Sequence, residues 1–233
     1  MSTELAGRRV AVTGAFGTLG VAAVKALHAA GARVAAIDRA EKPHASSDLG
    51  GAYLLGGVDL GGADVADAAL GAAATALGGL DALVNIAGTF RWETVTEGSL
   101  DTWDLLYAVN LRSAVAASKA AIPYLSKNPA GRIVNIGANA AAKAGAGMGA
   151  YTASKAGIAR LTEALADELK DRFITVNAIL PSIIDTPPNR ADMPKAEFDR
   201  WVRPEQIADV IVFLLSDRAS AVTGASIPVV GRV

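Results

Sequence analysis

Short runs of apolar and β-branched residues alternate along this chain with longer alanine-rich stretches, in which apolar residues recur at helical spacing. Strands that alternate with helices in this way favour a parallel, doubly wound α/β sheet. The predicted strands are Val10–Thr13, Arg33–Asp38, Tyr53–Val58, Ala82–Asn85, Arg132–Ile136, Thr175–Leu180 and Ser226–Val230. The predicted helices are Gly17–Ala30, Val65–Leu77, Thr102–Leu125, Tyr151–Lys170 and Pro204–Ser216.

The chain has 233 residues, a length typical of one α/β domain, and no linker or internal repeat divides it. Residues 1–233 are therefore expected to form a single domain. One segment, 181–204, breaks the alternation because it is rich in proline and charge and has little periodicity. A connection of this length in a compact domain is more often functional than accidental, so we expect a substrate loop or lid.

The net charge is −1, without long basic or acidic runs, which argues against a nucleic-acid partner. No apolar run approaches the roughly 18 residues of a membrane span, and a cytoplasmic location is expected. The chain has no cysteine, and neither His28 nor His44 has a partner at metal-ligand spacing. We therefore expect no metal site.

A glycine-rich segment, Gly14-Ala-Phe16-Gly17-Thr18-Leu19-Gly20, follows the first strand and opens the first helix. Glycine allows a sharp turn there and lets backbone N–H groups approach a pyrophosphate at the positive end of the helix. Because the segment has a strand before it and a helix after it, it predicts a dinucleotide site.

Asp38 ends the second predicted strand, 18 residues after Gly20. A carboxylate there accepts hydrogen bonds from both adenosine ribose hydroxyls and repels a 2′-phosphate, which favours NAD(H) over NADP(H). The neighbouring Arg39 points the other way, because an arginine could pair with that phosphate. Asp59 and Leu60, after the third strand, are placed to contact the adenine.

Tyr151 and Lys155 lie four residues apart at the start of a predicted helix, so their side chains share one face. An ammonium beside a phenol favours the phenolate, and we expect the pKa of Tyr151 to fall toward the working range. Tyrosine would then donate a proton as a hydride arrives, or accept one in the reverse direction.

Taken together, the motifs resemble the short-chain dehydrogenase/reductase family over essentially the whole chain. They are Thr-Gly-x-x-Gly-x-x-Gly at 13–20, Asn-Ile-Ala-Gly at 85–88, Asn110, Ile-Val-Asn-Ile at 133–136, Tyr-x-x-x-Lys at 151–155 and Val-Asn-Ala-x-x-Pro at 176–181. The resemblance implies a Rossmann-type, single-domain, NAD(P)(H)-dependent oxidoreductase that acts on a small molecule as a homodimer or homotetramer.

The resemblance also implies roles for individual residues. Tyr151 would be the acid/base and Lys155 its electrostatic partner, which also binds the nicotinamide ribose. Asn110 would hold a water that links Lys155 to solvent. The remaining cofactor contacts would come from Asn85, Ala87 and Gly88 beside the adenine ribose, and from Pro181, Ile184 and Thr186 near the carboxamide.

The chain departs from the family pattern where a serine normally polarises the substrate carbonyl, 13 residues before the tyrosine. Ala138 stands there and cannot donate a hydrogen bond. Loss of one positioned donor commonly costs on the order of 3 kcal/mol. Three explanations remain open: a substrate that needs no such donor, substitution by the amide of Asn139, or a nucleotide-binding protein that has lost catalysis.

The first explanation has support in a second resemblance. Residues 138–148 and 180–201 are similar to the pre-tyrosine segment and lid of dihydropteridine reductases, which also lack the serine. Phe90 falls where those enzymes carry an aromatic residue near the pterin. We therefore expect hydride transfer to a quinonoid dihydropterin or another C=N compound, with a ketone/alcohol or 3-oxoacyl reductase as the alternative and a non-catalytic nucleotide sensor as the third reading.

Overall fold

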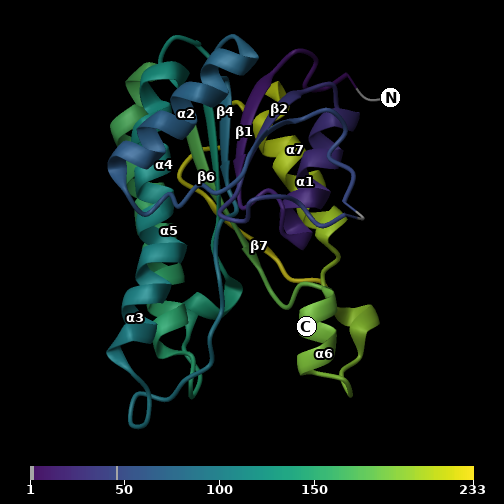
Figure 1. Cartoon of the computed structure of the whole chain (residues 1–233), viewed down its shortest axis with the longest axis vertical. Helices are drawn as coiled ribbons and strands as arrows, with labels where there is room; N and C mark the ends of the chain where they lie inside the picture. Colours follow the sequence, from purple (N-terminus) through teal and green to yellow (C-terminus); the bar gives the residue numbers. More distant parts are fainter. Residues whose placement is uncertain (1–2, 46) are drawn as a thin grey trace.

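The computed structural model of the protein describes residues 3–45 and 47–233 (Figure 1). Its strands are β1 (Arg9–Thr13), β2 (Arg33–Ile37), β3 (Tyr53–Leu55), β4 (Ala82–Asn85), β5 (Arg132–Ile136), β6 (Thr175–Pro181) and β7 (Ser226–Val229). Its α-helices are α1 (Thr18–Ala29), α2 (Ala63–Leu77), α3 (Leu100–Tyr107), α4 (Ser113–Leu125), α5 (Gly149–Leu169), α6 (Pro187–Asp192) and α7 (Pro204–Leu215).

The strands form one parallel sheet in the order β3-β2-β1-β4-β5-β6-β7. The chain builds outward from β1 in one direction and then returns to continue from β4 in the other. In open parallel sheets, the crevice beyond the carboxyl ends of the strands at such a switch point is the usual ligand site. The predicted doubly wound α/β fold is confirmed.

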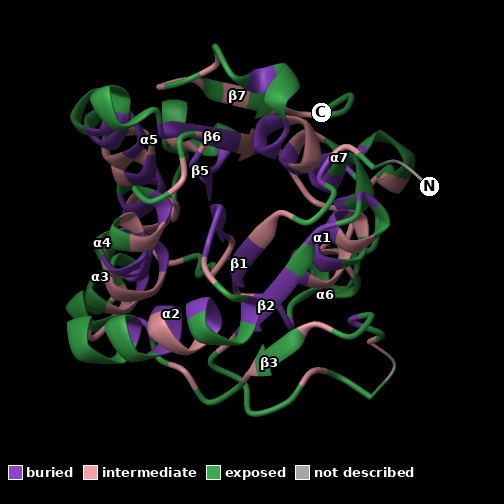
Figure 2. Cartoon of the chain, turned by 90° about the horizontal axis from the view of Figure 1, so that it is seen from above, coloured by how far each residue is buried: buried purple, intermediate pink, exposed green. Residues whose placement is uncertain are grey.

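Helices cover both faces of the sheet (Figure 2). Helices α1 and α7 pack with Val10 and Val12 of β1 on one face, whereas α2, α4 and the carboxyl half of α5 pack with Ala11 on the other. Successive side chains of a strand point to opposite faces, so a strand buried on both sides reads as a continuous apolar run. This explains why the sequence pattern located the central strands.

The helix predicted at Thr102–Leu125 is interrupted. Helix α3 ends at Tyr107, the segment Ala108–Arg112 is π-helical, and α4 continues from Ser113. Such π-helical turns are rare and often occur at functional sites, because they insert one residue and turn a side chain inward. Here the inserted turn carries Asn110, whose buried side chain bonds to groups outside the helix. Apolar periodicity alone does not reveal this insertion.

Segment 181–204 has more internal structure than its irregular sequence predicted. It contains α6 and a 3₁₀ turn, Phe198–Arg200. Arg190 binds both carboxylate oxygens of Asp185, at 2.5 and 2.7 Å, and its guanidinium lies 4.7 Å from the centre of the Phe198 ring. The segment is therefore a small lobe with its own contacts, lower right in Figure 1.

Other boundaries differ by a few residues. β3 is shorter than the predicted Tyr53–Val58 because pairing with β2 ends at Leu55, and β2 itself ends at Ile37. Within the described ranges, no helix is long and apolar enough to cross a membrane.

Candidate active site

A cavity of about 1520 Å³ lies at the carboxyl edge of the sheet. Pockets for a single drug-sized ligand are about 300–1,000 Å³, so this one has room for a dinucleotide and a second small molecule. All residues predicted to contact the cofactor or the substrate line this cavity, with the exception of Asn85. Of the three predicted catalytic residues, Tyr151 and Lys155 line the cavity and Asn110 does not. A separate cavity of about 450 Å³ beside His28 and Tyr53 contains none of the predicted residues.

The glycine segment forms the turn between β1 and α1. Gly14 has a φ of +65°, and a Cβ there would lie 2.7 Å from the backbone of Ala87. A Cβ on Gly20 would lie 2.6 Å from Cα of Ala15. These two glycines are therefore required by close backbone approach. Gly17 differs, because a Cβ there would meet nothing closer than 3.6 Å.

The amino end of α1 opens into the cavity. Its N-cap, Gly17, makes no side-chain capping bond, and the first turn has no acidic residue. The first backbone N–H groups of a helix have no partner within the helix and attract anions. Thr18 and Leu19 of this turn line the cavity, so the residues present fit the pyrophosphate of a dinucleotide.

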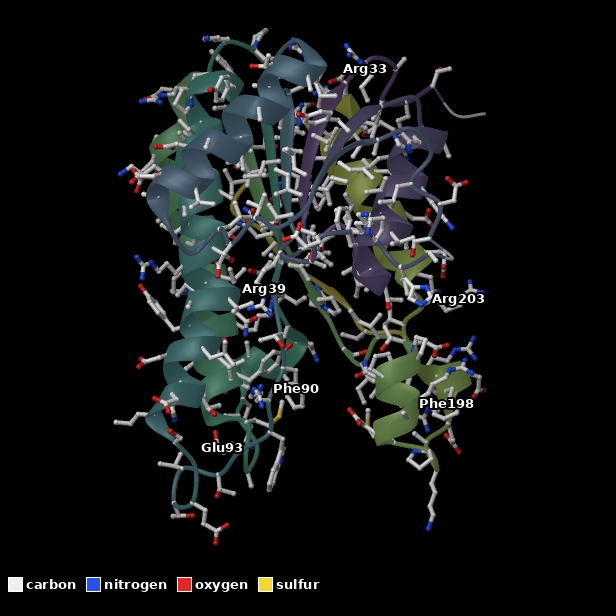
Figure 3. The ribbon with its side chains drawn as sticks, in the orientation of Figure 1. Arg33, Arg39, Phe90, Glu93, Phe198 and Arg203 are labelled. Carbon is white, nitrogen blue, oxygen red and sulfur yellow. The ribbon has the colours of Figure 1, made fainter. Side chains whose placement is uncertain are left out.

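Asp38 is held beside this turn by two backbone groups. Its Oδ2 accepts a hydrogen bond from the N–H of Phe16 at 2.9 Å, and its Oδ1 accepts one from Ala40 at 2.9 Å. The carboxylate is thus fixed at the cavity wall. Arg39 and Lys42 line the same region, and Arg39 is exposed (Figure 3).

Tyr151 and Lys155 both lie in the first turns of α5, where Lys155 is buried and Tyr151 is partly buried. Lys155 is only 5% exposed, and its Nζ donates to the carbonyl oxygen of Ile136 at 2.8 Å. Burial raises the pKa of Tyr151 to about 12 and lowers the pKa of Lys155 to about 8. The expected fall in the tyrosine pKa is therefore wrong for the chain alone, since burial dominates.

Asn110 connects the π-helical segment to the chemical residues without lining the cavity. Its Oδ1 accepts from the N–H of Thr89 at 2.7 Å, and its Nδ2 donates to Oγ of Ser154 at 3.0 Å. A Cβ on Gly88 would lie 3.1 Å from Asn110 Oδ1 and 3.2 Å from Lys155 Nζ. Both side chains therefore lie beside Gly88.

Asn85 is directed into the protein interior. Its Nδ2 donates to Oγ of Ser118 at 3.1 Å and to Oδ1 of Asn135 at 2.9 Å, and Asn135 in turn donates to Thr162 at 2.9 Å. These bonds link β4, β5, α4 and α5 beneath the cavity. The side chain of Asn85 thus lies away from the region where the adenine ribose was expected, because Ser118 and Asn135 engage its Nδ2 in the interior.

The donor normally supplied by serine has no replacement at position 138 itself. Ala138 is 5% exposed and extended, and the 3₁₀ turn Asn139–Ala142 begins directly after it. Asn139 is exposed and lines the cavity. The hydroxyl of Ser154 donates to the carbonyl oxygen of Tyr151 at 2.7 Å and is committed within the helix.

One aromatic side chain contacts Tyr151, and a second lines the same cavity. The ring of Phe90 meets the ring of Tyr151 edge to face, with centroids 5.0 Å apart and planes at 83°. Trp92, which the sequence analysis did not single out, also lines the cavity with Met148 and Met193. Its position two residues after Phe90, in the connection that leaves β4, was the available signal. Figure 3 shows Phe90 facing the space between the main body and the lobe that carries α6.

The lobe residues expected near the carboxamide also reach the cavity. Pro181, Ile184 and Thr186 all line it. Thr186 additionally caps α6, because its Oγ1 accepts from the N–H of Asn189 at 3.3 Å. The same threonine thus ties the position of α6 to the cavity wall.

The comparisons with known proteins agree with this geometry. The profile of the short chain dehydrogenase family matches residues 8–197. The chain is 35% identical to the L-xylulose reductase of Bos taurus over 244 positions, which cover 99% of this chain and 98% of the relative. It is also 35% identical to the 2-(S)-hydroxypropyl-CoM dehydrogenase 3 of Xanthobacter autotrophicus over 250 positions, with 99% and 98% covered.

The solved structure of an NAD⁺-bound xylitol dehydrogenase superposes with a TM-score of 0.90 at 26% identity, covering 98% of this chain and 99% of that one. The chain therefore belongs to the short-chain dehydrogenase family. It is an oxidoreductase of a family that uses NAD(P)(H), as the sequence motifs predicted.

Proposed function

We propose that the protein interconverts a small carbonyl compound and the corresponding alcohol, with a nicotinamide dinucleotide as hydride carrier. The observation that carries this proposal is that the amino end of α1, Asp38 and Tyr151 line one continuous cavity. The names of two relatives, a xylulose reductase and a hydroxypropyl-CoM dehydrogenase, favour carbonyl and alcohol chemistry over the C=N reduction expected from the lid.

The dinucleotide would lie with its pyrophosphate on the first turn of α1, its adenosine beside Asp38, Asp59 and Leu60, and its carboxamide near Thr186. When bound, it supplies or accepts the hydride. NAD(H) is favoured because the fixed Asp38 carboxylate would repel a 2′-phosphate. Asp38→Ser should shift the ratio of kcat/KM for NADH over NADPH toward NADPH by roughly tenfold or more, since Arg39 and Lys42 remain. An unchanged ratio would contradict the assignment.

Tyr151 would be the proton donor in carbonyl reduction. With a pKa near 12, its hydroxyl keeps its proton at neutral pH and can deliver it to the carbonyl oxygen. Alcohol oxidation needs the phenolate, which a protonated Lys155 would stabilise. Asn110 would act as a positioning residue, because it holds the N–H of Thr89 and the hydroxyl of Ser154, which directly precedes Lys155.

A second hydrogen bond to the substrate oxygen would come from Asn139. Its side chain lines the cavity directly after Ala138 and makes no hydrogen bond within the described residues, so its amide is free to donate. Ser154 is unsuitable because its hydroxyl is already committed to Tyr151. Asn139→Ala should lower kcat for a ketone by about ten- to a hundredfold if this amide polarises the carbonyl.

A quinonoid dihydropterin is the second candidate. It is favoured by one observation: the wall at Ala138 offers no donor, while Phe90 presents a ring beside Tyr151 on which a planar heterocycle could stack. On this reading Tyr151 would protonate a ring nitrogen.

The deciding experiment measures NADH oxidation with a panel of ketones and with quinonoid dihydropterin, using the wild type, Asn139→Ala and Ala138→Ser. Ketone turnover that falls in Asn139→Ala supports the main proposal. Turnover of the pterin alone supports the second candidate. Tight NADH binding without turnover in either panel would overturn both.

Segment 181–204 would close over the cavity as a lid, since Ile184, Asn189 and Met193 all line it. A homodimer or homotetramer and a cytoplasmic location stay predictions from the sequence.

A further inference from the structure

Two large aromatic side chains in the connection directly after β4 are exposed to solvent. Phe90 is 51% exposed and Trp92 is 62% exposed, and both line the cavity that contains Tyr151. Exposed apolar surface gathered at a cavity marks a place that a ligand covers. Burial of such rings is worth about 1.5–3 kcal/mol each, so these side chains can contribute strongly to substrate selection.

Trp92 is exposed but firmly held. Its Nε1 donates to the carbonyl oxygen of Ala146 at 3.0 Å, and the N–H of Glu93 donates to the carbonyl of Gly147 at 2.9 Å. Gly147 has a φ of +72°, and any Cβ there would overlap the indole. The indole therefore packs directly on the backbone at Gly147, and its only polar atom, Nε1, is hydrogen-bonded. The surface that it exposes to the cavity is the apolar part of the ring.

The neighbouring lining is also apolar. Phe90 is fixed edge to face against Tyr151, and Met148 and Met193 contribute flexible thioethers that adapt well to ring faces. These side chains come from three separate connections, and they make the lining of the cavity that contains Tyr151 rich in hydrocarbon and sulfur.

Two polar side chains that line the cavity on the lobe side are committed, and Asp192 presents a carboxylate to it. Oγ of Ser182 donates to the carbonyl of Val230 at 2.8 Å, and Nδ2 of Asn189 donates to the carbonyl of Ile184 at 2.7 Å. Asn139 is needed by the reacting carbonyl itself. Each substrate hydroxyl buried without a partner costs about 1–3 kcal/mol, so a sugar or polyol with more hydroxyls than Asp192 can accept would bind poorly.

Cationic side chains lie elsewhere. Among the described residues that line the cavity, Arg39 and Lys42 follow β2 at the adenosine end, and Lys155 is buried against Ile136. Arg91, between Phe90 and Trp92 in the chain, is exposed, does not line the cavity and interacts with Glu93. A carboxylate, sulfonate or phosphate on the substrate would therefore find no positive partner among the lining residues beside Phe90 and Trp92. The substrate end suits a neutral molecule.

We propose that the substrate is a neutral, apolar carbonyl compound that contains a ring, and that Trp92 is the residue that selects it. This inference rests on the proposed function and specifies its substrate. It separates the protein from its relatives named for xylulose and for hydroxypropyl-CoM, since the first is a sugar and the second carries a CoM group.

The experiment compares kcat/KM for 1-tetralone, a neutral fused-ring ketone, with kcat/KM for L-xylulose, using NADH as cofactor. The wild type should prefer tetralone by on the order of a hundredfold, because two or more sugar hydroxyls would lose partners. Trp92→Ala should reduce this preference about tenfold through KM for tetralone, whereas Trp92→Phe should largely keep it.

Leu100→Ala is the matched control, because Leu100 is 80% exposed and does not line the cavity. It should leave the preference unchanged. KM for NADH should be the same in all variants. A wild type that prefers xylulose, or a Trp92→Ala variant with an unaltered preference, would overturn the proposal.

Binding is followed separately by tryptophan fluorescence of the NADH complex. Tetralone should quench the wild type and Trp103→Phe, but not Trp92→Phe, since Trp103 does not line the cavity. If no ketone is turned over, the proposed function fails, but quenching that depends on Trp92 still supports a neutral, apolar ring compound as the ligand. If that quenching is absent, the proposed ligand class is overturned.

Discussion

The cofactor end and the chemical end of the cavity are built in different ways. At the cofactor end, Gly14, Gly17 and Asp38 belong to one continuous β1-α1-β2 unit and act largely through backbone geometry. At the chemical end, Phe90, Tyr151 and Met193 come from three separate connections of the sheet and act through side chains. The first region is specified locally, whereas the second exists only when the whole sheet is assembled. A substitution at one end of the cavity should therefore leave the function of the other end largely unchanged.

The sharpest test of this separation is Tyr151→Phe. Removal of the hydroxyl should lower kcat about a thousandfold, since a positioned acid/base contributes roughly 10²–10⁴. The Kd for NADH should change by less than about threefold, because Asp38 and the α1 turn are untouched. Stopped-flow turnover and fluorescence titration measure the two quantities. A comparable loss in both would show that the two ends are not independent.

Lys155→Met tests the chemical end through stability. Burial depresses the pKa of Lys155 from 10.5 to about 8, so between these values the unfolded chain binds more protons than the folded one. The unfolding free energy of the wild type should therefore rise with pH in this window, relative to the variant, by up to about 3 kcal/mol. Below pH 8 the wild type carries the full cost of a buried ammonium, and Lys155→Met should be the more stable protein.

Urea unfolding at pH 7, 8.5 and 10 measures this difference. The titration of Tyr151 has the opposite effect on the unfolding free energy, because its raised pKa makes the folded protein less stable as pH rises from 10 toward 12. Wild type and variant both contain Tyr151, so this effect cancels in the difference between them. A pH-independent difference between wild type and variant would mean that the lysine is better solvated than its burial indicates.

The smallest expected effect is at the cofactor end. Gly14→Ala should weaken NADH binding by at least tenfold and lower stability by about 1–2 kcal/mol, because its φ of +65° and the contact with Ala87 exclude a side chain. Gly62→Ala is the matched control, because Gly62 does not line the cavity and a Cβ there would meet nothing closer than 3.6 Å, so it should retain the affinity. Isothermal titration and thermal unfolding give both values. Equal effects at the two positions would refute the steric argument.

The same contrast explains what could be predicted from the sequence. The central strands and the glycine turn were predicted because their signals are local: a continuous apolar run, or glycine where β1 passes into α1. The motif order was also sufficient to bring Asp38, Ala138 and Tyr151 to one edge, since the carboxyl ends of parallel strands share that edge.

Other features depend on packing between distant segments and could not be read in this way. The direction of the Asn85 side chain depends on Ser118 and Asn135, which lie in other elements. Trp92 becomes part of the cavity through Gly147, and no periodicity links these two positions. The tyrosine pKa rises because of burial, which outweighs the neighbouring lysine that the four-residue spacing revealed.

The π-helical segment Ala108–Arg112 also determines how the side chains of α4 are rotated about the helix axis relative to those of α3. Helix α3 packs against α5, and α4 packs against α2, so the two halves of this long helix serve different neighbours. Each residue of an α-helix advances the side-chain direction by about 100°. Deletion of one residue from the π-helical segment would restore a regular helix, withdraw Asn110 and rotate Ser118 away from Asn85. One inserted residue thus keeps two packing interfaces in register with the cavity between them.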